Sequence, residues 1–188
     1  RLHASTDYSE ETAPPIATSD PHAETNCSTL LTGNEGEEKA GRTFTYDFNG
    51  VNIKTTTSLE STLDTMTLST TQRPPISAPS ASAAKKRATL FTGNEGEEKA
   101  ERTFNYDFNG VNIKTTTILE YTLDTMTKST TYKGNVSGAP AATDIKNFVT
   151  LFTGNDGEEK AERTLNYTSN GVNTHTTTPP YTKPNTTP

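Results

Sequence analysis

Apolar and polar residues alternate in two stretches of the chain that are nearly identical in sequence. In residues 103–115, large apolar residues occupy every second position leading up to Asn109-Gly110, and the alternation continues beyond it. Such alternation is typical of half-buried β-strands. Asn-Gly between two alternating segments favours a two-residue hairpin turn, because both residues tolerate positive φ. The pattern therefore predicts a β-hairpin over 103–115 and another over the equivalent residues 43–55.

The two-residue turn would fix the register of each hairpin and therefore its apolar face. In the second hairpin this register places Phe108 opposite Val111 and Tyr106 opposite Ile113, with Phe104 opposite a threonine, Thr115. The polar residues between them point to the other side. The predicted apolar faces consist of Phe44, Tyr46, Phe48, Val51 and Ile53 in the first hairpin and of Phe104, Tyr106, Phe108, Val111 and Ile113 in the second.

Both hairpins lie within a repeating unit. Its copies open with the same Thr-Leu-(Leu/Phe)-Thr-Gly-Asn segment, at offsets of 60 and 61 residues. Residues 29–71 and 89–131 differ at only six positions, which is typical of recent duplication. A fixed period of this kind indicates a repeat architecture. The three copies begin at Thr29, Thr89 and Thr150.

The third copy has lost most of the predicted apolar face. Ser169 stands where the second copy has Phe108, and Pro179-Pro180 replaces the apolar segment that follows the Thr run in the other copies. A lone two-stranded hairpin is marginally stable in water. We therefore expect residues 165–188 to be disordered.

Two other parts of the unit carry a local pattern. Residues 97–102, in the acidic head of the second copy, are good helix formers with acidic and basic residues close together, and they predict a short solvated helical turn. Residues 118–126 fit a strand through the alternation of Leu119, Tyr121 and Leu123, and they also fit a short helix. Their β-branched and aromatic neighbours favour the strand.

Composition limits how much of the chain can fold. Only 29% of the residues are hydrophobic, and there is no Trp. Ordering one residue costs about 1–2 kcal/mol of backbone entropy, and a chain with little apolar surface to bury tends to stay disordered. The predicted fold class is a largely disordered repeat protein with small, mostly β elements, namely the Asn-Gly hairpins. The predicted divisions are a disordered N-terminal segment (1–28), repeat 1 (29–71), a linker (72–88), repeat 2 (89–131), a second linker (132–149), and a truncated, degenerate repeat 3 with a disordered tail (150–188).

Charge and residue types exclude several functions. The net charge of −6 argues against nucleic-acid binding, which needs clustered Lys and Arg. No stretch approaches the ~18 apolar residues of a membrane helix, so no membrane span is expected. The single cysteine, Cys27, allows no disulfide within one chain, and His3, His22 and His175 lack metal-ligand spacing. No catalytic, cofactor-binding or metal site is predicted, and we do not expect an enzyme.

Four Asn-x-Ser/Thr sequons offer acceptors for N-glycosylation in a secreted chain. Runs of Thr at 55–57, 115–117 and 176–178 suit O-glycosylation, while the same residues also favour β-strands. The predicted N-glycosylation sites are Asn26, Asn135, Asn166 and Asn185.

The acidic heads resemble an element of a family of secreted proteins. Residues 86–102 run from Lys-Arg to Glu-Glu-Lys-Ala-Glu-Arg and look like the N-terminal leader of secreted oomycete RXLR–dEER effectors. In that family a short basic-hydrophobic motif precedes an acidic run ending in Glu-Glu-Arg. This chain contains no Arg-x-Leu-Arg, and Lys-Ala interrupts its acidic run. The dEER-like residues are Glu97, Glu98, Glu101 and Arg102 in the second copy and Glu158, Glu159, Glu162 and Arg163 in the third.

The resemblance implies secretion, entry into a host cell and action by binding host proteins. Together with the repeats and the small core, it favours a secreted, non-enzymatic repeat protein that acts by protein binding as a pathogen effector in virulence. Its expected partners are host or extracellular proteins. The alternative is a glycosylated, Thr-rich stalk at the cell surface. A start at Arg1 rather than Met is expected for a processed secretory chain or for a fragment.

Overall fold

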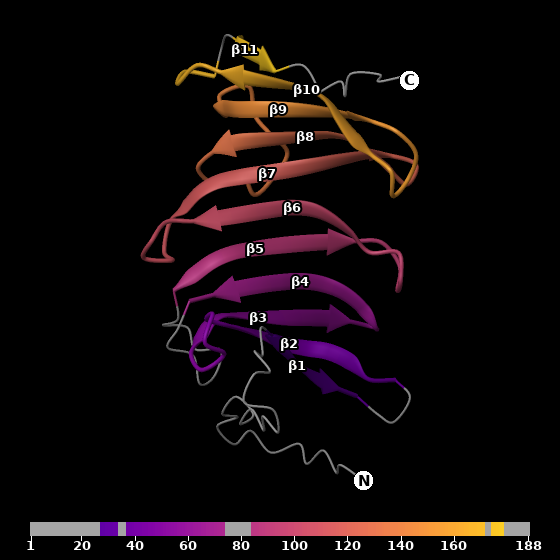
Figure 1. Cartoon of the computed structure of the whole chain (residues 1–188). Coiled ribbons are helices and arrows are strands. Elements are labelled where there is room, and N and C mark those ends of the chain that lie inside the picture. Colours follow the sequence, from indigo (N-terminus) through magenta and orange to yellow (C-terminus); the bar gives the residue numbers. More distant parts are fainter. Residues whose placement is uncertain (1–26, 34–36, 74–83, 172–173, 179–188) are drawn as a thin grey trace, which may run out of the picture.

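The computed structural model describes residues 27–33, 37–73, 84–171 and 174–178. In these residues eleven antiparallel strands form one sheet, and each strand pairs with the strands that precede and follow it in sequence (Figure 1). The strands are β1 (Cys27–Thr32), β2 (Lys39–Tyr46), β3 (Ile53–Thr62), β4 (Thr65–Gln72), β5 (Lys85–Thr92), β6 (Lys99–Tyr106), β7 (Ile113–Thr122), β8 (Thr125–Lys133), β9 (Lys146–Thr153), β10 (Lys160–Tyr167) and β11 (Thr174–Thr178).

Each copy of the repeating unit contributes consecutive strands to this sheet. The first copy forms β1–β4, the second forms β5–β8, and the third forms β9–β11. Ordinary strand pairing joins the units: Thr70 on β4 lies opposite Ala88 on β5, and Thr130 on β8 lies opposite Val149 on β9. The sheet is therefore continuous across both unit boundaries.

Threonines fourteen residues apart face one another across neighbouring strands. β-Branched side chains suit the pleated strand, and opposed threonines can also hydrogen bond, which contributes about 0.2–1 kcal/mol per pair. These pairs stabilise the sheet where large apolar side chains are scarce. The Oγ1–Oγ1 distances are 3.2 Å for Thr29–Thr43, 3.0 Å for Thr57–Thr71, 3.1 Å for Thr89–Thr103, 2.8 Å for Thr117–Thr131 and 3.1 Å for Thr150–Thr164.

Most of the fully buried side chains lie on the other face of the sheet. There, large residues on β2 and β6 pack beside small ones on β3 and β7. Phe44 lies opposite Thr56, and Phe104 lies opposite Thr116. Alternating large and small side chains fill space at the density of a protein interior. Phe44 is only 1% exposed, and it is the largest of the fully buried side chains.

The connection between β8 and β9 folds back over this buried face. The Thr116 hydroxyl donates to the carbonyl oxygen of Gly134 (2.7 Å) and accepts from the amide of Val136 (3.0 Å). The guanidinium of Arg102 donates to the carbonyl oxygens of Val136 (2.6 Å) and Gly138 (3.0 Å), and both Arg102 and Val136 are buried. Residues within the stretch predicted as the second linker therefore cover part of the sheet.

The prediction of a largely disordered chain is wrong for the residues that the structure describes. The prediction considered only the stabilisation that burial of apolar side chains could provide. In a continuous antiparallel sheet, each strand also satisfies backbone groups of its neighbours, and threonine pairs occupy positions that the composition registers as polar. Segments expected to be linker or disordered lie in strands: β5 begins at Lys85, β9 begins at Lys146, and β11 lies within 165–188.

The predicted two-residue Asn-Gly turns are also wrong. Tyr106 does lie opposite Ile113, as expected, but a bulge between Asn105 and Tyr106 moves Phe104 from Thr115 to the next residue. The turn is a six-residue loop, 107–112, and the equivalent loop in the first copy is 47–52. The residues expected to extend the apolar face, Phe48, Val51, Phe108 and Val111, are exposed in these loops, whereas Phe44 and Tyr46 are buried and Ile53, Phe104, Tyr106 and Ile113 are half-buried.

The acidic head forms no helix. Lys99 opposite Thr92 already begins the β5–β6 pairing, and a turn closed by a bond from the Glu97 amide to the Asn94 carbonyl oxygen (3.0 Å) connects the two strands. Gly93 has φ +125°, which is outside helical backbone. The strand interpretation of 118–126 is confirmed, with a turn at Leu123 between β7 and β8.

Substitution of Phe44 by Ala should destabilise the first unit by about 3–5 kcal/mol, because it leaves a cavity on the buried face. Phe48→Ala, four residues further on in an exposed loop, is the matched control and should change stability by less than about 0.5 kcal/mol. Urea denaturation followed by circular dichroism measures both. Equal effects of the two variants would contradict the assignment of the buried face.

Candidate functional site

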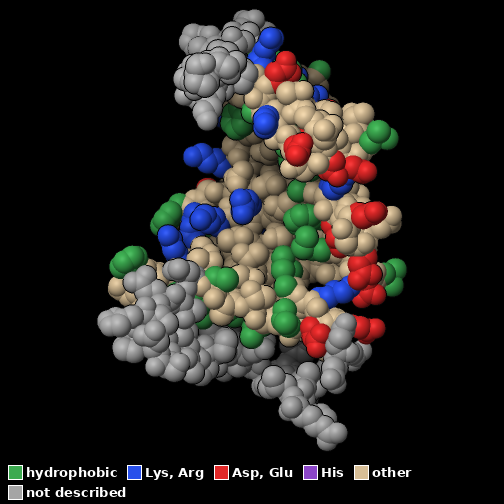
Figure 2. Space-filling view, turned by 45° about the vertical axis from the view of Figure 1, so that its right-hand side comes forward, with side chains coloured by type: hydrophobic (Ala, Val, Ile, Leu, Met, Phe, Trp, Pro, Cys, Tyr) green, Lys and Arg blue, Asp and Glu red, His purple; other side chains and the backbone are tan. Residues whose placement is uncertain are grey.

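The loops at the two ends of the strands carry opposite charges, and we call these two sides of the molecule the acidic edge and the basic edge. Figure 2 shows acidic side chains along one side of the molecule and Lys and Arg side chains along the other. The acidic edge consists of the loops 33–38, 63–64, 93–98, 123–124 and 154–159, and its described carboxylates are Glu37, Glu38, Asp64, Glu95, Glu97, Glu98, Asp124, Asp156, Glu158 and Glu159. The basic edge consists of the described loop residues at the other ends of the strands, with the adjoining strand ends, and its cations are Lys54, Arg73, Lys85, Lys86, Arg87, Lys114, Lys133 and Lys146.

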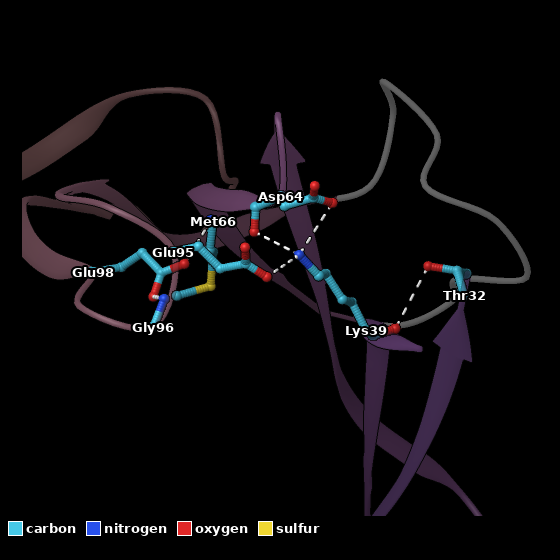
Figure 3. A network of polar contacts seen from close by, with 7 residues as sticks. All are labelled: Thr32, Lys39, Asp64, Met66, Glu95, Gly96 and Glu98. Atoms are coloured by element: carbon cyan, nitrogen blue, oxygen red, sulfur yellow. Dashed lines mark hydrogen bonds and ion pairs between the residues drawn. The ribbon is translucent and has the colours of Figure 1, made fainter. Parts of the chain in front are cut away.

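We call the acidic segment that opens each unit its head; in the second unit the head is residues 93–102. On the acidic edge, the head of the second unit contacts the β3–β4 turn of the first unit (Figure 3). Lys39 Nζ lies 3.1 Å from Asp64 Oδ1 and 2.8 Å from Glu95 Oε1, so it joins a carboxylate of its own unit to one of the next. Glu98 Oε1 accepts from the amide of Met66 (3.0 Å), and Glu98 Oε2 accepts from the amide of Gly96 (3.0 Å). The head therefore satisfies the amide of Met66, which follows the turn of the preceding unit.

The same contacts recur at the second unit boundary. Glu159 Oε1 accepts from the amide of Met126 (3.0 Å), and Lys99 Nζ lies 2.8 Å from Asp124 Oδ1. The glutamate bond therefore joins neighbouring units at both boundaries, whereas Lys99 pairs with an aspartate of its own unit. The sequence signal for this role is the pair of glutamates that directly precedes a lysine in every copy, at Lys39, Lys99 and Lys160.

These contacts shift the pKa values of the groups that make them. Hydrogen bonds from backbone amides, that of Met66 first, lower the pKa of Glu98, and the Met126 amide does the same for the pKa of Glu159. The hydrogen bond to Glu95, more than that to Asp64, raises the pKa of Lys39. All three residues are only half-buried, so salt still screens the interactions and their contribution to stability is small.

An aspartate organises each long loop of the basic edge. In the second unit, Asp107 Oδ1 accepts from the amides of Val111 (3.1 Å) and Asn112 (3.4 Å), and Asp107 Oδ2 accepts from Asn112 Nδ2 (2.9 Å). The bond from Asn112 contributes most to the lowered pKa of Asp107. Asp47 makes the same bonds in the first unit. Both loops are therefore closed by their own side chains and display their apolar residues in a fixed conformation.

The tips of these loops are apolar and exposed. Phe48 is 80% exposed and Phe108 is 82% exposed, and a valine lies exposed beside each of them. Arg73, which directly follows the last strand of the preceding unit, donates to the carbonyl oxygen of Phe108, and its guanidinium carbon lies 5.0 Å from the centre of the Phe108 ring. Gly110 has φ +74° and lies so close to the backbone of Lys85 that a Cβ would clash. The sequence pattern identified this glycine correctly as a turn residue with positive φ.

An open groove of about 630 Å³ lies beside the loop of the second unit. It combines polar and apolar side chains, with the Lys85 ammonium 5.8 Å from the centre of the Tyr106 ring. The groove therefore extends the basic edge onto the sheet. Its lining consists of Lys85, Tyr106, Gly110, Val111, Asn112, Ile113 and Asn135.

The dEER-like residues do not gather into one site. Glu98 and Glu159 cap turns, and Arg102 is buried against the β8–β9 connection. The remaining five are exposed, and they are distributed over two loops and two strands: Glu97, Glu101, Glu158, Glu162 and Arg163. In the described structure, three of the eight dEER-like residues have structural roles: Glu98, Glu159 and Arg102.

The predicted glycosylation sites differ in accessibility. Asn135 is exposed in the connection that covers the sheet, whereas Asn166 is half-buried in β10. Asn26 and Asn185 lie outside the described residues. The middle residues of two Thr runs, Thr56 and Thr116, are buried.

The described residues contain no group of three or more His, Cys, Asp or Glu side chains that could hold a metal ion. Cys27 is a free, exposed thiol on β1. His3, His22 and the side chain of His175 lie outside the described part of the chain. No helix in that part is long and apolar enough to cross a bilayer. Comparison of the chain with protein-family models and with curated proteins finds no match.

The double variant Glu98→Gln/Glu159→Gln should flatten the acid dependence of stability. A carboxylate with a lowered pKa contributes stability that is present above its ordinary pKa and is lost as the pH falls through the lowered value. The variant should therefore be less stable than wild type at pH 7, and the difference should narrow as the pH falls below the ordinary glutamate pKa of about 4.3.

Thermal unfolding at a series of pH values measures the difference between the two proteins. Glu97→Gln/Glu158→Gln, at the exposed neighbouring positions, is the control and should follow the wild-type curve. A gap between Glu98→Gln/Glu159→Gln and wild type that stays constant as the pH falls below about 4.3 would contradict the role of the two carboxylates.

Proposed function

We propose that this chain is a secreted, non-enzymatic binding protein whose basic edge contacts another protein. The observation that carries the proposal is the duplication of one apolar loop tip on a single sheet. Phe48 with Val51 and Phe108 with Val111 are exposed in equivalent loops, and each loop is closed by the hydrogen bonds of its own aspartate. Exposed aromatic side chains among cations, on a preformed loop, are typical of protein interfaces.

The repeat gives these tips a defined separation. Equivalent strands of neighbouring units, such as β3 and β7, are four strand spacings apart, which corresponds to about 19 Å at about 4.8 Å per spacing. Two tips on one sheet can engage two sites on a partner together, and the second contact then benefits from a high effective concentration. A modest contact at each tip is therefore sufficient for stable attachment.

The resemblance of the heads to the dEER element supports an effector that acts on host proteins. Because that element belongs to secreted proteins, the resemblance also supports secretion. The roles of Glu98 and Glu159 at the unit boundaries give these residues a second, structural reason to recur. The effector role therefore rests on the resemblance, and the binding role rests on the loop tips.

The binding role can be tested with a photoreactive phenylalanine analogue placed at position 48 or position 108. Both positions should cross-link to the same protein, either a host protein in extract or a second copy of this chain. For a host protein, an excess of unlabelled wild-type protein should abolish the cross-link, whereas unlabelled Phe48→Ser/Phe108→Ser protein should compete at least tenfold less well (about 1.4 kcal/mol or more). Equal competition by both proteins would contradict binding through the basic edge.

A glycosylated stalk is the second candidate, favoured by the exposed Asn135 in a sequon whose Ser137 is also exposed. Protein isolated from its native source should then carry a glycan at Asn135, with a mass above the 20.3 kDa of the polypeptide. Mass spectrometry before and after enzymatic deglycosylation measures the excess, and Asn135→Gln should remove it. Native protein of unmodified mass would exclude the stalk and leave the binding proposal unaffected.

A further inference from the structure

The acidic edge also exposes large apolar side chains. Leu63 is 93% exposed and Leu123 is 94% exposed, each in the two-residue turn between its strands. Both residues have positive φ, 48° for Leu63 and 56° for Leu123, a conformation that glycine and asparagine adopt far more readily than leucine. These leucines therefore bury little apolar surface within their own chain, and they are accessible to another molecule.

The leucines and the phenylalanines lie at opposite ends of the same strands. Phe48 precedes β3 and Leu63 follows it; Phe108 precedes β7 and Leu123 follows it. A shift of a second copy along the strand direction brings its two leucines to the two phenylalanines of the first copy at once. The spacing matches because one repeat generated both edges.

The charges beside these residues are complementary. Next to the leucines, the side chains of Asp64, Glu95 and Asp124 remain 73%, 63% and 77% exposed even with their lysine contacts. Next to the phenylalanines, Lys54 and Lys114 are exposed and form no ion pair with a described residue. The carboxylates directly before the phenylalanines, Asp47 and Asp107, are half-buried and hydrogen-bonded within their own loops. Figure 2 shows the separation of the two charges across the width of the molecule.

We propose that the partner of the basic edge is the acidic edge of a second copy of this chain, so that copies associate side by side along the strand direction. The inference rests on the binding role proposed above for the basic edge, and it identifies the partner. Each copy uses a different surface on its two sides, which makes the contact heterologous. Such contacts extend into an open series unless the geometry closes them into a ring.

Sedimentation velocity on two edge variants tests the inference. Leu63→Ser/Leu123→Ser alters only the acidic edge, and Phe48→Ser/Phe108→Ser alters only the basic edge. Wild type should form dimers and larger species as its concentration rises from about 1 μM to about 500 μM, and about 500 mM salt should weaken the association. Each variant alone should associate at least tenfold more weakly. An equimolar mixture should form a dimer and nothing larger, because the two intact edges complement each other once.

Every changed residue is at least 80% exposed, so both variants should fold, and circular dichroism with thermal unfolding checks this. A monomeric wild type at about 500 μM would overturn the inference, as would failure of the mixture to form a dimer.

A separate experiment uses vesicles of anionic phospholipid. Binding of monomeric wild type to the vesicles through the phenylalanines would assign the basic edge to a lipid surface. If wild type stays monomeric while the phenylalanines still cross-link a host protein, the binding role stands and only the choice of partner fails.

Discussion

Hydrogen bonding of each strand to the strand before it in sequence is the interaction on which this structure depends. All ten pairings in the described residues are antiparallel and join consecutive strands. Such contacts are local along the chain, so little loop-closure entropy is lost as each strand is added. The stability of such an array is approximately a sum over units and their shared boundaries. The two faces then divide the side chains: one carries threonine pairs, and the other carries aromatic residues beside small ones.

The boundaries between units need more than strand pairing. A meander leaves turns at both edges, with amides that only solvent would satisfy. On the acidic edge, the head of one unit satisfies the amide after the turn of the preceding unit, as Glu98 does for Met66. On the basic edge, Arg73 holds the loop of the following unit through a carbonyl oxygen of its tip. The edges that give the molecule its surface character are therefore also where its units are joined.

Local patterns in the sequence predicted strands better than composition predicted the fold. Alternation placed strands around Phe104 and Ile113 and favoured one over 118–126, because that pattern depends on the residues themselves. The long loop closed by Asp107 depends on side-chain hydrogen bonds that the Asn-Gly signal does not contain, and the bulge at Asn105 shifts the register that a two-residue turn would set. Disorder was predicted because threonine counts as polar, although Thr116 is fully buried in this sheet. The roles of Glu98 and Lys39 involve a neighbouring unit, and no pattern within one unit reveals them.

Because the sheet is continuous across its unit boundaries, its length is set by the number of repeated units. Gain or loss of one whole copy would change the length of the sheet by about 19 Å, at about 4.8 Å for each of four strands, and would leave every remaining junction of the same kind. Near-identical copies are also the sequences most easily gained or lost by unequal recombination. Evolution can therefore change the span of the molecule in whole steps, with the spacing of its loop tips held constant.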